Sequence, residues 1–487
     1  VASDLTYGGG SSLTLEAGRN LTVNAGVTLK VPVFQSQSGF IPSVLTLTAA
    51  AAGISGRDPA GTLQVLGNLS ASGLALAAGS GGIVLGGQLT TLPGTVNSIA
   101  FATTGSVTQT GGSLATGNLT GNAASLSLTQ AANQVGGIGV AGAQFTTTLG
   151  GATVTTAVPL SIGSTGAIPG GLAVPAGQTI SIQADTLTLA SSGGPVLSAP
   201  GGTVALAPLT ANQGILVSGI ANASSGTTTY AVAQLGLVQA STLQLGAGAA
   251  STGSITFGLS ASDPVDLIAN GNFARLALAT GGTVQQNGAL TVNALSGRAG
   301  GVILNTITNR IAAIEGLVAD GQLQVVTSGD LTVSGATSGN NGLDLTAGGA
   351  FNLTGSGSIL GPNGISLSAG FALIQAGMTL AGTVFSNQSV SLSAGTGGIA
   401  LSGAIQPGQS LSISTTGALT QTGGAVTGGT LYGTAASVSL PSRGNAINAL
   451  GVFAPLDVTS GDLLVVNSTP LAIQNNSDGG LGGLILS

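Results

Sequence analysis

A long internal repeat is the feature that most constrains how this chain folds. Residues 103–140 (TTGSVTQTGGSLATGNLTGNAASLSLTQAANQVGGIGV) return without a gap as residues 415–452 (TTGALTQTGGAVTGGTLYGTAASVSLPSRGNAINALGV), and about half of the positions are identical. A looser third copy begins at Gly282. Repetition on this scale is typical of solenoids and arrays, in which each unit buries its apolar face against the next. The positions kept are glycines, small polar residues and aliphatics, among them Gly105 with Gly417, Gly121 with Gly433 and Gly297, Gln109 with Gln421 and Gln286, and Asn133 with Asn445 and Asn309.

Short alternating strips between turn signals predict short strands. From Ser12 the sequence reads SLTLEAGRNLTVNAGVTLKVPV, in which aliphatic residues occupy every second position for three to five residues before a Gly- or Asn-containing break. This period of two indicates strands that are buried on one side. Helix is disfavoured because 85 of the 487 residues are glycine and charged residues make up only 4%. We therefore expect an all-β chain whose corners use Gly and Asn to adopt positive φ angles.

Strands of this length cannot form independent domains. The apolar area that a single coil of about 20 residues buries roughly balances the conformational entropy lost on ordering it. Stability must come from stacking, where every strand pairs with strands in the coils above and below. The chain is therefore predicted to form a parallel β-solenoid, an elongated rod of roughly 20–25 coils.

The domain prediction is one continuous solenoid over residues 1–487, because no charged or Pro-rich linker divides the chain. Related units are expected near 103–162, 282–334 and 415–473. Residues 31–61 break the alternation and are predicted to leave the solenoid as a loop. The last residues, LGGLILS, keep the strand rhythm, so we expect an uncapped end and self-association of rods end to end or side by side into filaments.

Composition excludes several classes of function. The seven basic residues are scattered singly in a chain of net charge -6, which disfavours nucleic acid as a partner. No window approaches the roughly 20 apolar residues of a membrane-spanning helix. The chain has no His and no Cys, which are the commonest metal ligands and nucleophiles. We expect no metal site and no cofactor.

One family resemblance follows from the repeated motifs. The units read G-x-[VL]-x-Q-x-G-G, then L-x-L, then N-x-I-x-x-L-G, and a late segment reads DLLVVNSTPLAI. These motifs resemble the central repeats of filamentous-haemagglutinin-type exoproteins, and the resemblance covers most of the chain. It implies a single right-handed parallel β-helix, export by the two-partner secretion route, and a role in adhesion, biofilm or contact between cells.

Polysaccharide-degrading enzymes also use β-helices, so catalytic carboxylates must be considered. The closest acidic pair is Asp263 and Asp266, with Arg275 near in sequence. We favour a solvated turn over a catalytic pair there. The other grouped acids stand in or beside Gly-containing turns and are expected to be corner residues: Asp320, Asp330, Asp457 and Asp462.

Two recurring polar patterns have a structural and a functional interpretation. The repeated Gln and Asn residues could form a sugar-binding ladder, but we favour amide side chains that close a turn or stack inside a bend. The Thr-rich pieces could suggest an ice-binding face. That face would require T-x-T at one fixed place in successive coils, and we find no such arrangement in the sequence.

The sequence thus predicts an extracellular structural or adhesive solenoid that forms a fibre on the bacterial cell surface and performs no catalysis. We expect no catalytic, cofactor-binding or metal-binding residues. Expected partners are other copies of the chain and, as a second class, surface glycans or neighbouring cells. The alternative is a β-helix protein that binds or degrades polysaccharide.

Overall fold

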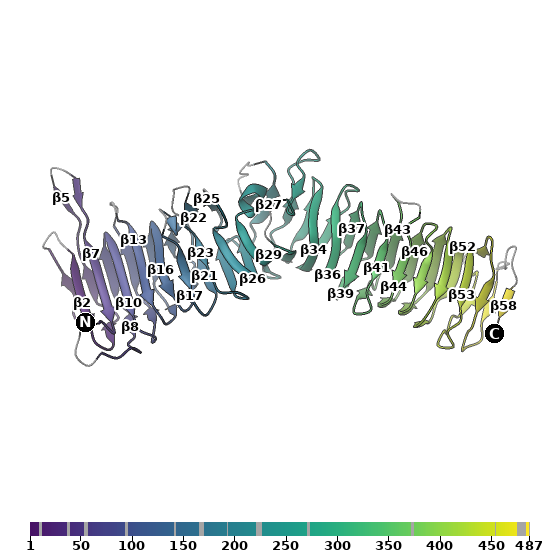
Figure 1. Ribbon diagram of the computed structural model, residues 1–487, viewed down its shortest axis with the longest axis horizontal. Coiled ribbons are helices and arrows are strands. Elements are labelled where there is room, and N and C mark those ends of the chain that lie inside the picture. The colour runs from purple at the N-terminus through teal and green to yellow at the C-terminus, as the bar shows by residue number, and fades with distance from the viewer. Residues whose placement is uncertain are drawn as a thin grey trace. The chain divides into compact units, whose positions relative to one another are not determined.

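The computed structural model confirms an all-β chain wound into a parallel β-solenoid of about 19 turns (Figure 1). It describes residues 1–487 apart from 9–11, 37–38, 53–56, 93–95, 141–142, 165–169, 192, 221–225, 270–272, 372–374, 453, 475–483 and 487; at 34–36, 39–41 and 484–486 only the backbone is described. The number of turns falls just below the predicted 20–25 because some turns are longer than the assumed 20 or so residues. One example is the turn that separates the paired residues Gly73 and Ser98.

The chain consists of two compact units. The first unit comprises Val1–Ile215, Ala221–Ala247 and Ala269–Ala274, and the second comprises Leu216–Ile220, Gly248–Ile268 and Arg275–Ser487. Within each unit, most turns contribute three short strands. Most strands pair in parallel with their equivalents one turn before and one turn after.

Three ladders of parallel strands build most of the first unit. The first ladder contains β2 (Leu13–Ala17), β7 (Val44–Ala49), β10 (Gly73–Ala78), β13 (Ser98–Thr103), β16 (Asn118–Ala123), β20 (Phe145–Thr147), β23 (Leu172–Ala173), β26 (Leu197–Ala207) and β29 (Val238–Gly248). The second contains β3 (Leu21–Val23), β8 (Leu63–Val65), β11 (Ile83–Leu85), β14 (Val107–Gln109), β17 (Leu126–Leu128), β21 (Ala152–Thr155) and β24 (Thr179–Gln183). The third contains β1 (Leu5–Thr6), β4 (Thr28–Lys30), β9 (Asn68–Ala71), β12 (Gln88–Thr91), β15 (Ser113–Thr116) and β18 (Gln134–Val135), and a shorter series adds β19 (Gly137–Ile138), β22 (Leu160–Ser164) and β25 (Leu187–Ser191).

The second unit repeats this plan. Its first ladder contains β30 (Ile255–Phe257), β33 (Thr283–Gln286), β35 (Gly301–Leu304), β37 (Leu323–Thr327), β40 (Leu343–Ala347), β43 (Ile365–Ala369), β46 (Ser389–Ala394), β49 (Ser410–Thr415), β52 (Thr430–Ala435), β54 (Ala449–Leu450), β55 (Leu456–Val458) and β57 (Ala472–Ile473). The second contains β31 (Val265–Asp266), β32 (Arg275–Thr280), β34 (Leu290–Ala299), β36 (Arg310–Ala319), β38 (Leu331–Ser334), β41 (Phe351–Leu353), β44 (Met378–Leu380), β47 (Ile399–Leu401), β50 (Ala418–Gln421), β53 (Ser437–Leu440), β56 (Leu463–Val465) and β58 (Leu484–Leu486). The third contains β39 (Ala336–Gly339), β42 (Ser358–Leu360), β45 (Thr383–Ser386), β48 (Ala404–Pro407) and β51 (Ala425–Val426).

The core consists of aliphatic columns that follow directly from the alternation in sequence. Leu345 pairs with Leu367, which pairs with Leu392 in the next turn, and all three side chains are buried. The residues between them along each strand face outward and are small and polar. Because each inward side chain lies on its equivalents in adjacent turns, no turn completes its core without its neighbours.

Glycine supplies nearly all of the positive-φ corners. Among the described non-Gly residues, only Ala50 and Asn97 have positive φ. The expectation that Asn would share this role is therefore wrong apart from Asn97. The physical reason is visible in the repeats, where the conserved asparagines are buried and used for their side-chain amides.

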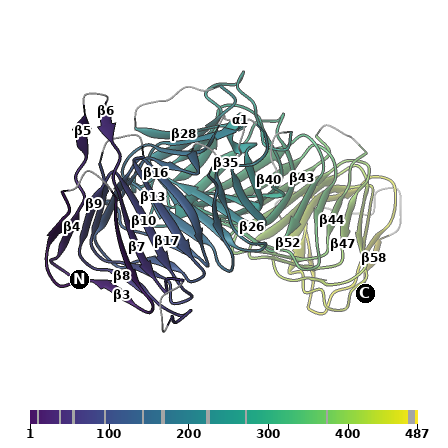
Figure 2. The ribbon, with the colours of Figure 1, turned by 60° about the vertical axis from the view of Figure 1, so that its left-hand side comes forward.

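The predicted excursion at 31–61 contains two strands that pair with each other and with no solenoid strand. These are β5 (Phe34–Ser36) and β6 (Gly39–Ile41), an antiparallel hairpin that stands apart from the stacked strands in Figure 2. The excursion is shorter than predicted, since residues Val44–Ala49 already form the solenoid strand β7. Residues 53–56 of the predicted loop lie outside the described part.

Among the described residues, α-helix is limited to one short turn. After β27 (Gly214–Ser218) and β28 (Thr227–Ala231), the single-turn helix α1 spans Val232–Leu235. None of the helical segments that the structure describes has the length and apolar character needed to cross a membrane.

Candidate functional site

Asp263 is a buried turn residue and not the solvated one that the sequence suggested. Its side chain is 1% exposed. Its two carboxyl oxygens accept hydrogen bonds from the Ser218 hydroxyl (2.7 Å), the Gly219 N–H (2.9 Å) and the Leu259 N–H (2.8 Å). These bonds join the turn that follows β30 to the end of β27. The carboxyl group is thus engaged in holding two loops together.

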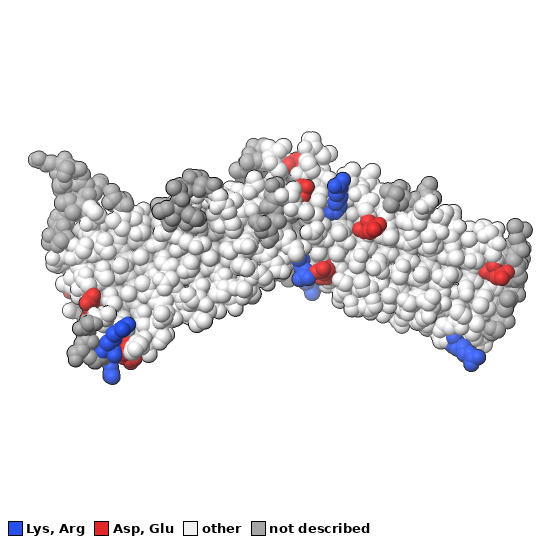
Figure 3. Space-filling view, in the orientation of Figure 1, with Lys and Arg blue, Asp and Glu red and all other residues white. Residues whose placement is uncertain are grey.

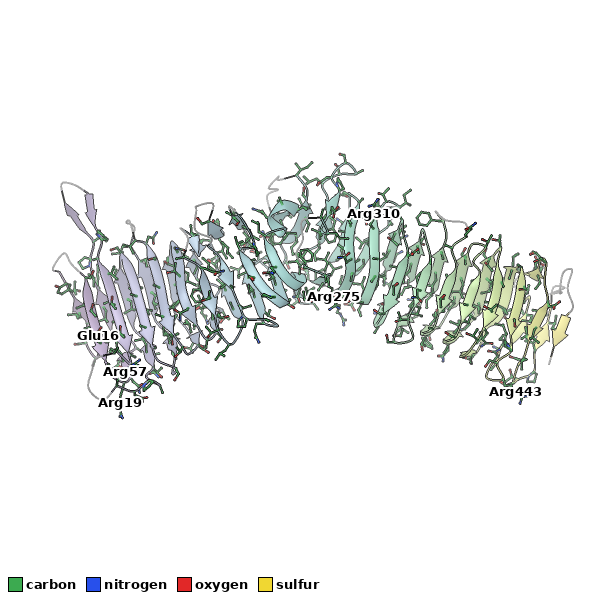
Figure 4. The ribbon with its side chains drawn as sticks, in the orientation of Figure 1. Glu16, Arg19, Arg57, Arg275, Arg310 and Arg443 are labelled. Carbon is green, nitrogen blue, oxygen red and sulfur yellow. The ribbon has the colours of Figure 1, made fainter. Side chains whose placement is uncertain are left out.

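Asp266 and Arg275 do not join Asp263 in a common site. Asp266 accepts a hydrogen bond from the Ile268 N–H (3.0 Å) in its own turn. Arg275, labelled in Figure 4, forms an ion pair with Glu315. The parallel stacking of β32, β34 and β36 places Arg275 beside this carboxylate on β36, where its charge is paired.

The remaining acidic residues serve varied local roles. Asp320 pairs with Arg298 at 2.6 Å, and Asp330 accepts the Ala350 N–H (2.8 Å) from the next turn. Asp457 lies at the centre of β55 with its side chain exposed, so it is not the corner residue that we expected. Within the described residues, no group of three or more acidic side chains is positioned to hold a metal ion.

The repeated amides lie inside the solenoid and form three equivalent pairs. Gln109 and Asn133 exchange two hydrogen bonds, from Gln Nε2 to Asn Oδ1 (2.9 Å) and from Asn Nδ2 to Gln Oε1 (2.8 Å). The same reciprocal pair recurs at Gln286 with Asn309 and at Gln421 with Asn445, with all four distances 2.9 Å. The three asparagines are fully buried. These contacts confirm the structural interpretation over a sugar-binding ladder.

A regular outward surface lies on the first ladder of the second unit, and the sequence alone did not reveal it. Ser366 pairs with Ser391, which pairs with Ser412, and two positions further along each strand Ser368, Ser393 and Ser414 are likewise in register. We call this surface the hydroxyl face. It comprises two columns, Asp344, Ser366, Ser391, Ser412 and Tyr432 in the first and Thr346, Ser368, Ser393, Ser414 and Thr434 in the second.

The hydroxyl face has a defined spacing and little charge. Turns are about 4.8 Å apart and alternate residues on a strand are about 6.6 Å apart, so the hydroxyls form a nearly rectangular grid. The only charge in the two columns is Asp344 at one end. Figure 3 shows the same sparseness of charge over much of the described surface in that view. Each hydroxyl can donate and accept a hydrogen bond, so the grid suits a neutral, hydroxyl-rich partner.

The signal for the hydroxyl face is present in the sequence as the repeated tripeptides SLS, SLS and SIS at 366, 391 and 412. These serines do not match the T-x-T pattern of an ice-binding face, and turns of unequal length hide their alignment in the sequence. The threonine runs do not supply an equivalent grid. Thr147 and Thr228 within them are buried.

Tyr230 is a buried titratable group in the first unit. Burial raises the pKa of Tyr230, and the nearby negative charge of Asp185 raises it further. The Asp185 carboxylate accepts hydrogen bonds from the Thr210 N–H (2.8 Å) and hydroxyl (2.7 Å). This cluster joins β28 to the loops beside it, and we assign it a structural role.

The raised pKa of Tyr230 predicts a loss of stability in alkali. The unfolded chain loses the phenolic proton near pH 10, whereas the folded chain retains it. The contribution of Tyr230 to the free energy of unfolding is therefore fully present below about pH 10 and decreases as the pH rises above that value. Hydrogen exchange or thermal unfolding should show that stability falls less between pH 8 and pH 11 in Tyr230→Phe than in the parent. Equal losses of stability in the two proteins would contradict a raised pKa of Tyr230.

In comparisons with known proteins, no family model, no curated protein and no solved structure matches the chain. The stacked parallel ladders and the three structurally equivalent amide pairs define its class without such a match. The chain is a β-helical repeat protein.

Proposed function

We propose that this chain is an extracellular structural or adhesive β-solenoid, part of a fibre at the bacterial cell surface, that acts through its lateral surface without catalysis. The observation that carries the proposal is the hydroxyl face. Ten outward residues on five consecutive turns form a regular grid, in which nine carry a hydroxyl group and Asp344 carries the one charge. Such a surface offers many weak, equivalent contacts.

Repeated weak contacts suit adhesion better than chemistry. A grid gains affinity by engaging several equivalent groups at once, because each additional contact is made at high effective concentration. The near absence of charge also leaves little electrostatic repulsion between copies of the chain. Contacts between copies and contacts with neutral glycans are both consistent with these properties.

The family context of the proposal rests on the repeats. The recurring Gln and Asn residues that suggested a filamentous-haemagglutinin-type exoprotein occupy structurally equivalent interior positions. This supports a common ancestry of the three units and agrees with the β-helix that the resemblance implies. Export by two-partner secretion and a role in biofilm or cell contact are part of the proposal.

Attachment of protein-coated beads tests the proposed function. Beads coated with the full chain are expected to clump or to be retained on cell layers and polysaccharide-coated surfaces. The triple variant Ser366→Glu, Ser391→Glu and Ser412→Glu places three charges in the first column, and we expect attachment to fall about tenfold or more because each contact then requires desolvation of a charge. Circular dichroism should be unchanged, since these side chains face outward.

A matched control carries the same three charges on another outward column of the second unit. Thr332, Asn352 and Thr379 are in register on β38, β41 and β44. Their replacement by Glu should leave most of the attachment intact. Equal loss in both triple variants would show a general charge effect and remove the support that the hydroxyl face gives to the proposal.

The second candidate function is recognition of a polysaccharide, with or without its degradation. The observation that favours it is the composition of the first column, where Asp344 precedes the serines and Tyr432 follows them. A carboxylate and a phenol ring beside hydroxyls provide strong acceptors and an apolar surface for sugar rings. Retention on polysaccharide that is lost in Asp344→Ala and Tyr432→Ala, with no clumping of beads, would favour this candidate.

A further inference from the structure

The aliphatic core of this solenoid does not by itself specify which turn stacks on which. The inward residues of successive strands are nearly interchangeable, as in Leu343 and Leu345, Ile365 and Leu367, and Val390 and Leu392. A slip of two residues, or of one whole turn, would keep aliphatic side chains inward and serines outward. Glycine-rich corners tolerate the changed loop lengths. The sequence therefore needs some other means of fixing its register.

The buried amide pairs meet this need because each asparagine contacts three successive turns. Asn445 Oδ1 accepts the Val426 N–H (2.8 Å) as well as the Gln421 amide of the preceding turn. Its Nδ2 lies within hydrogen-bond distance of Leu440 O (3.2 Å) in its own turn and Val466 O (3.2 Å) in the next.

Asn309 has the same environment, with Leu290 N–H at 2.8 Å, Leu304 O at 3.2 Å and Val326 O at 3.0 Å. In the first unit Asn133 accepts the Leu114 N–H at 2.9 Å. Each unit therefore contains at least one such pair. The Gln–Asn pair and the backbone N–H bonded to the Asn Oδ1 recur in all three repeats, so they are a specific feature of the fold and not an accident of packing.

We propose that the three Gln–Asn pairs are register locks, polar contacts that select the native stacking of turns over slipped alternatives. In a slipped register the Gln and Asn amides would face aliphatic side chains, and a buried backbone N–H would lose its acceptor. Each unpaired buried group is costly, whereas the aliphatic contacts are nearly unchanged by the slip. A polar residue that fixes register within an apolar interface has a parallel in coiled coils. This role is independent of what the outer surface binds.

Disulfide capture can measure register directly, because the chain has no cysteine of its own. Thr420 and Ser439 are directly paired on β50 and β53. A cysteine pair at these positions reports the native register, since the spacing of adjacent strands permits a disulfide. A second pair, Thr420→Cys with Ser437→Cys, reports a slip of two residues. Each full-length chain is unfolded, refolded under oxidising conditions and analysed for cross-linked peptides.

The test compares these reporters with and without the lock. With Gln421 and Asn445 intact, the native disulfide should dominate. The double variant Gln421→Leu and Asn445→Leu should raise the ratio of slipped to native disulfide by about tenfold or more. The control Leu401→Met and Leu440→Met perturbs the same core while retaining both amides, and its ratio should equal that of the parent. An unchanged ratio in the double leucine variant would overturn the proposal.

A second variant keeps the test decisive if the double leucine chain does not fold. Gln421→Leu alone removes the side-chain pair between turns but leaves the backbone contacts of Asn445 in place. It should fold, as judged by its β-sheet circular dichroism, and should also raise the slipped fraction. A folded Gln421→Leu chain with the parental ratio would contradict the register-lock role.

Discussion

Replacement of Gly121 by alanine is expected to lower the local free energy of unfolding around β16 by about 2 kcal/mol or more. Gly121 has a φ of 116°, which side-chain-bearing residues rarely adopt, and an added Cβ would collide with the carbonyl oxygen of Phe101. Gly121 also lies in register between Phe101 and Phe145, whose rings meet edge to face with centroids 6.4 Å apart. Because Gly121 has no side chain, the rings of Phe101 and Phe145 can make contact although they lie two turns apart.

Hydrogen exchange of the segment 98–128 is the suitable measurement, because a solenoid need not unfold in one step. Gly193→Ala is the matched control, since Gly193 is exposed and an added Cβ there meets nothing within 4 Å. The control should change local stability by less than about 0.5 kcal/mol. The equivalent glycine of the last repeat, Gly433 with a φ of 119°, should behave as Gly121 does. Unchanged local stability in both Gly121→Ala and Gly433→Ala would contradict the structure at these two strand positions.

Replacement of Asp263 by alanine should cost about 3 kcal/mol or more of local stability. The change leaves the N–H groups of Gly219 and Leu259 without their acceptor, and unpaired buried donors cost about 1–3 kcal/mol each. The Ser218 hydroxyl also loses its bond to the carboxylate but keeps the Ile220 carbonyl oxygen within reach at 2.6 Å. Asp263→Asn should also lower the local stability, because the NH₂ group of the new side chain would face one of these hydrogen-bond donors. Hydrogen exchange of residues 214–220 and 255–268 reports the effect.

Asp266→Ala is the control for this prediction. Asp266 is only partly buried, and the Ile268 N–H whose hydrogen bond it accepts lies in its own turn, so its loss should cost less than about 1 kcal/mol. The comparison separates a structural aspartate from a surface one in the same tetrapeptide. Similar effects of the two substitutions would show that the buried contacts of Asp263 contribute little.

The fold was predictable because two independent signals agreed. The alternation of apolar and polar residues in segments such as SLTLEAG predicts strands with one buried face. The repeat of 103–140 at 415–452 predicts that the turns built from these strands stack on one another. The corner chemistry was predicted only in part, since Asn133 and Asn445 resemble turn residues in sequence but use their amides inside the core. Whether an asparagine turns the backbone or bonds through its side chain depends on the turn above it. Local sequence does not contain that information.

The candidate sites were less predictable because they depend on register. Arg275 and Glu315 are distant in sequence and meet only because β32, β34 and β36 stack. The serines of the hydroxyl face form columns for the same reason. The burial of Asp263 could be predicted only if it were known that β27 lies beside its turn. In each case a residue was visible in the sequence, but its neighbours one or two turns away were not.

Attachment to surfaces and turnover of polysaccharide, measured together, test whether this chain is a non-catalytic adhesive solenoid. Purified full-length chain is incubated with cell layers and with insoluble pectin, alginate and similar polymers, and both the retained protein and the soluble sugar released are quantified. We expect the chain to be retained on at least one of these surfaces, retention to be reduced in the triple glutamate variant of the hydroxyl face, and no sugar to be released. Release of soluble oligosaccharide by the parent chain, abolished in Asp266→Ala, would contradict a non-catalytic adhesive solenoid.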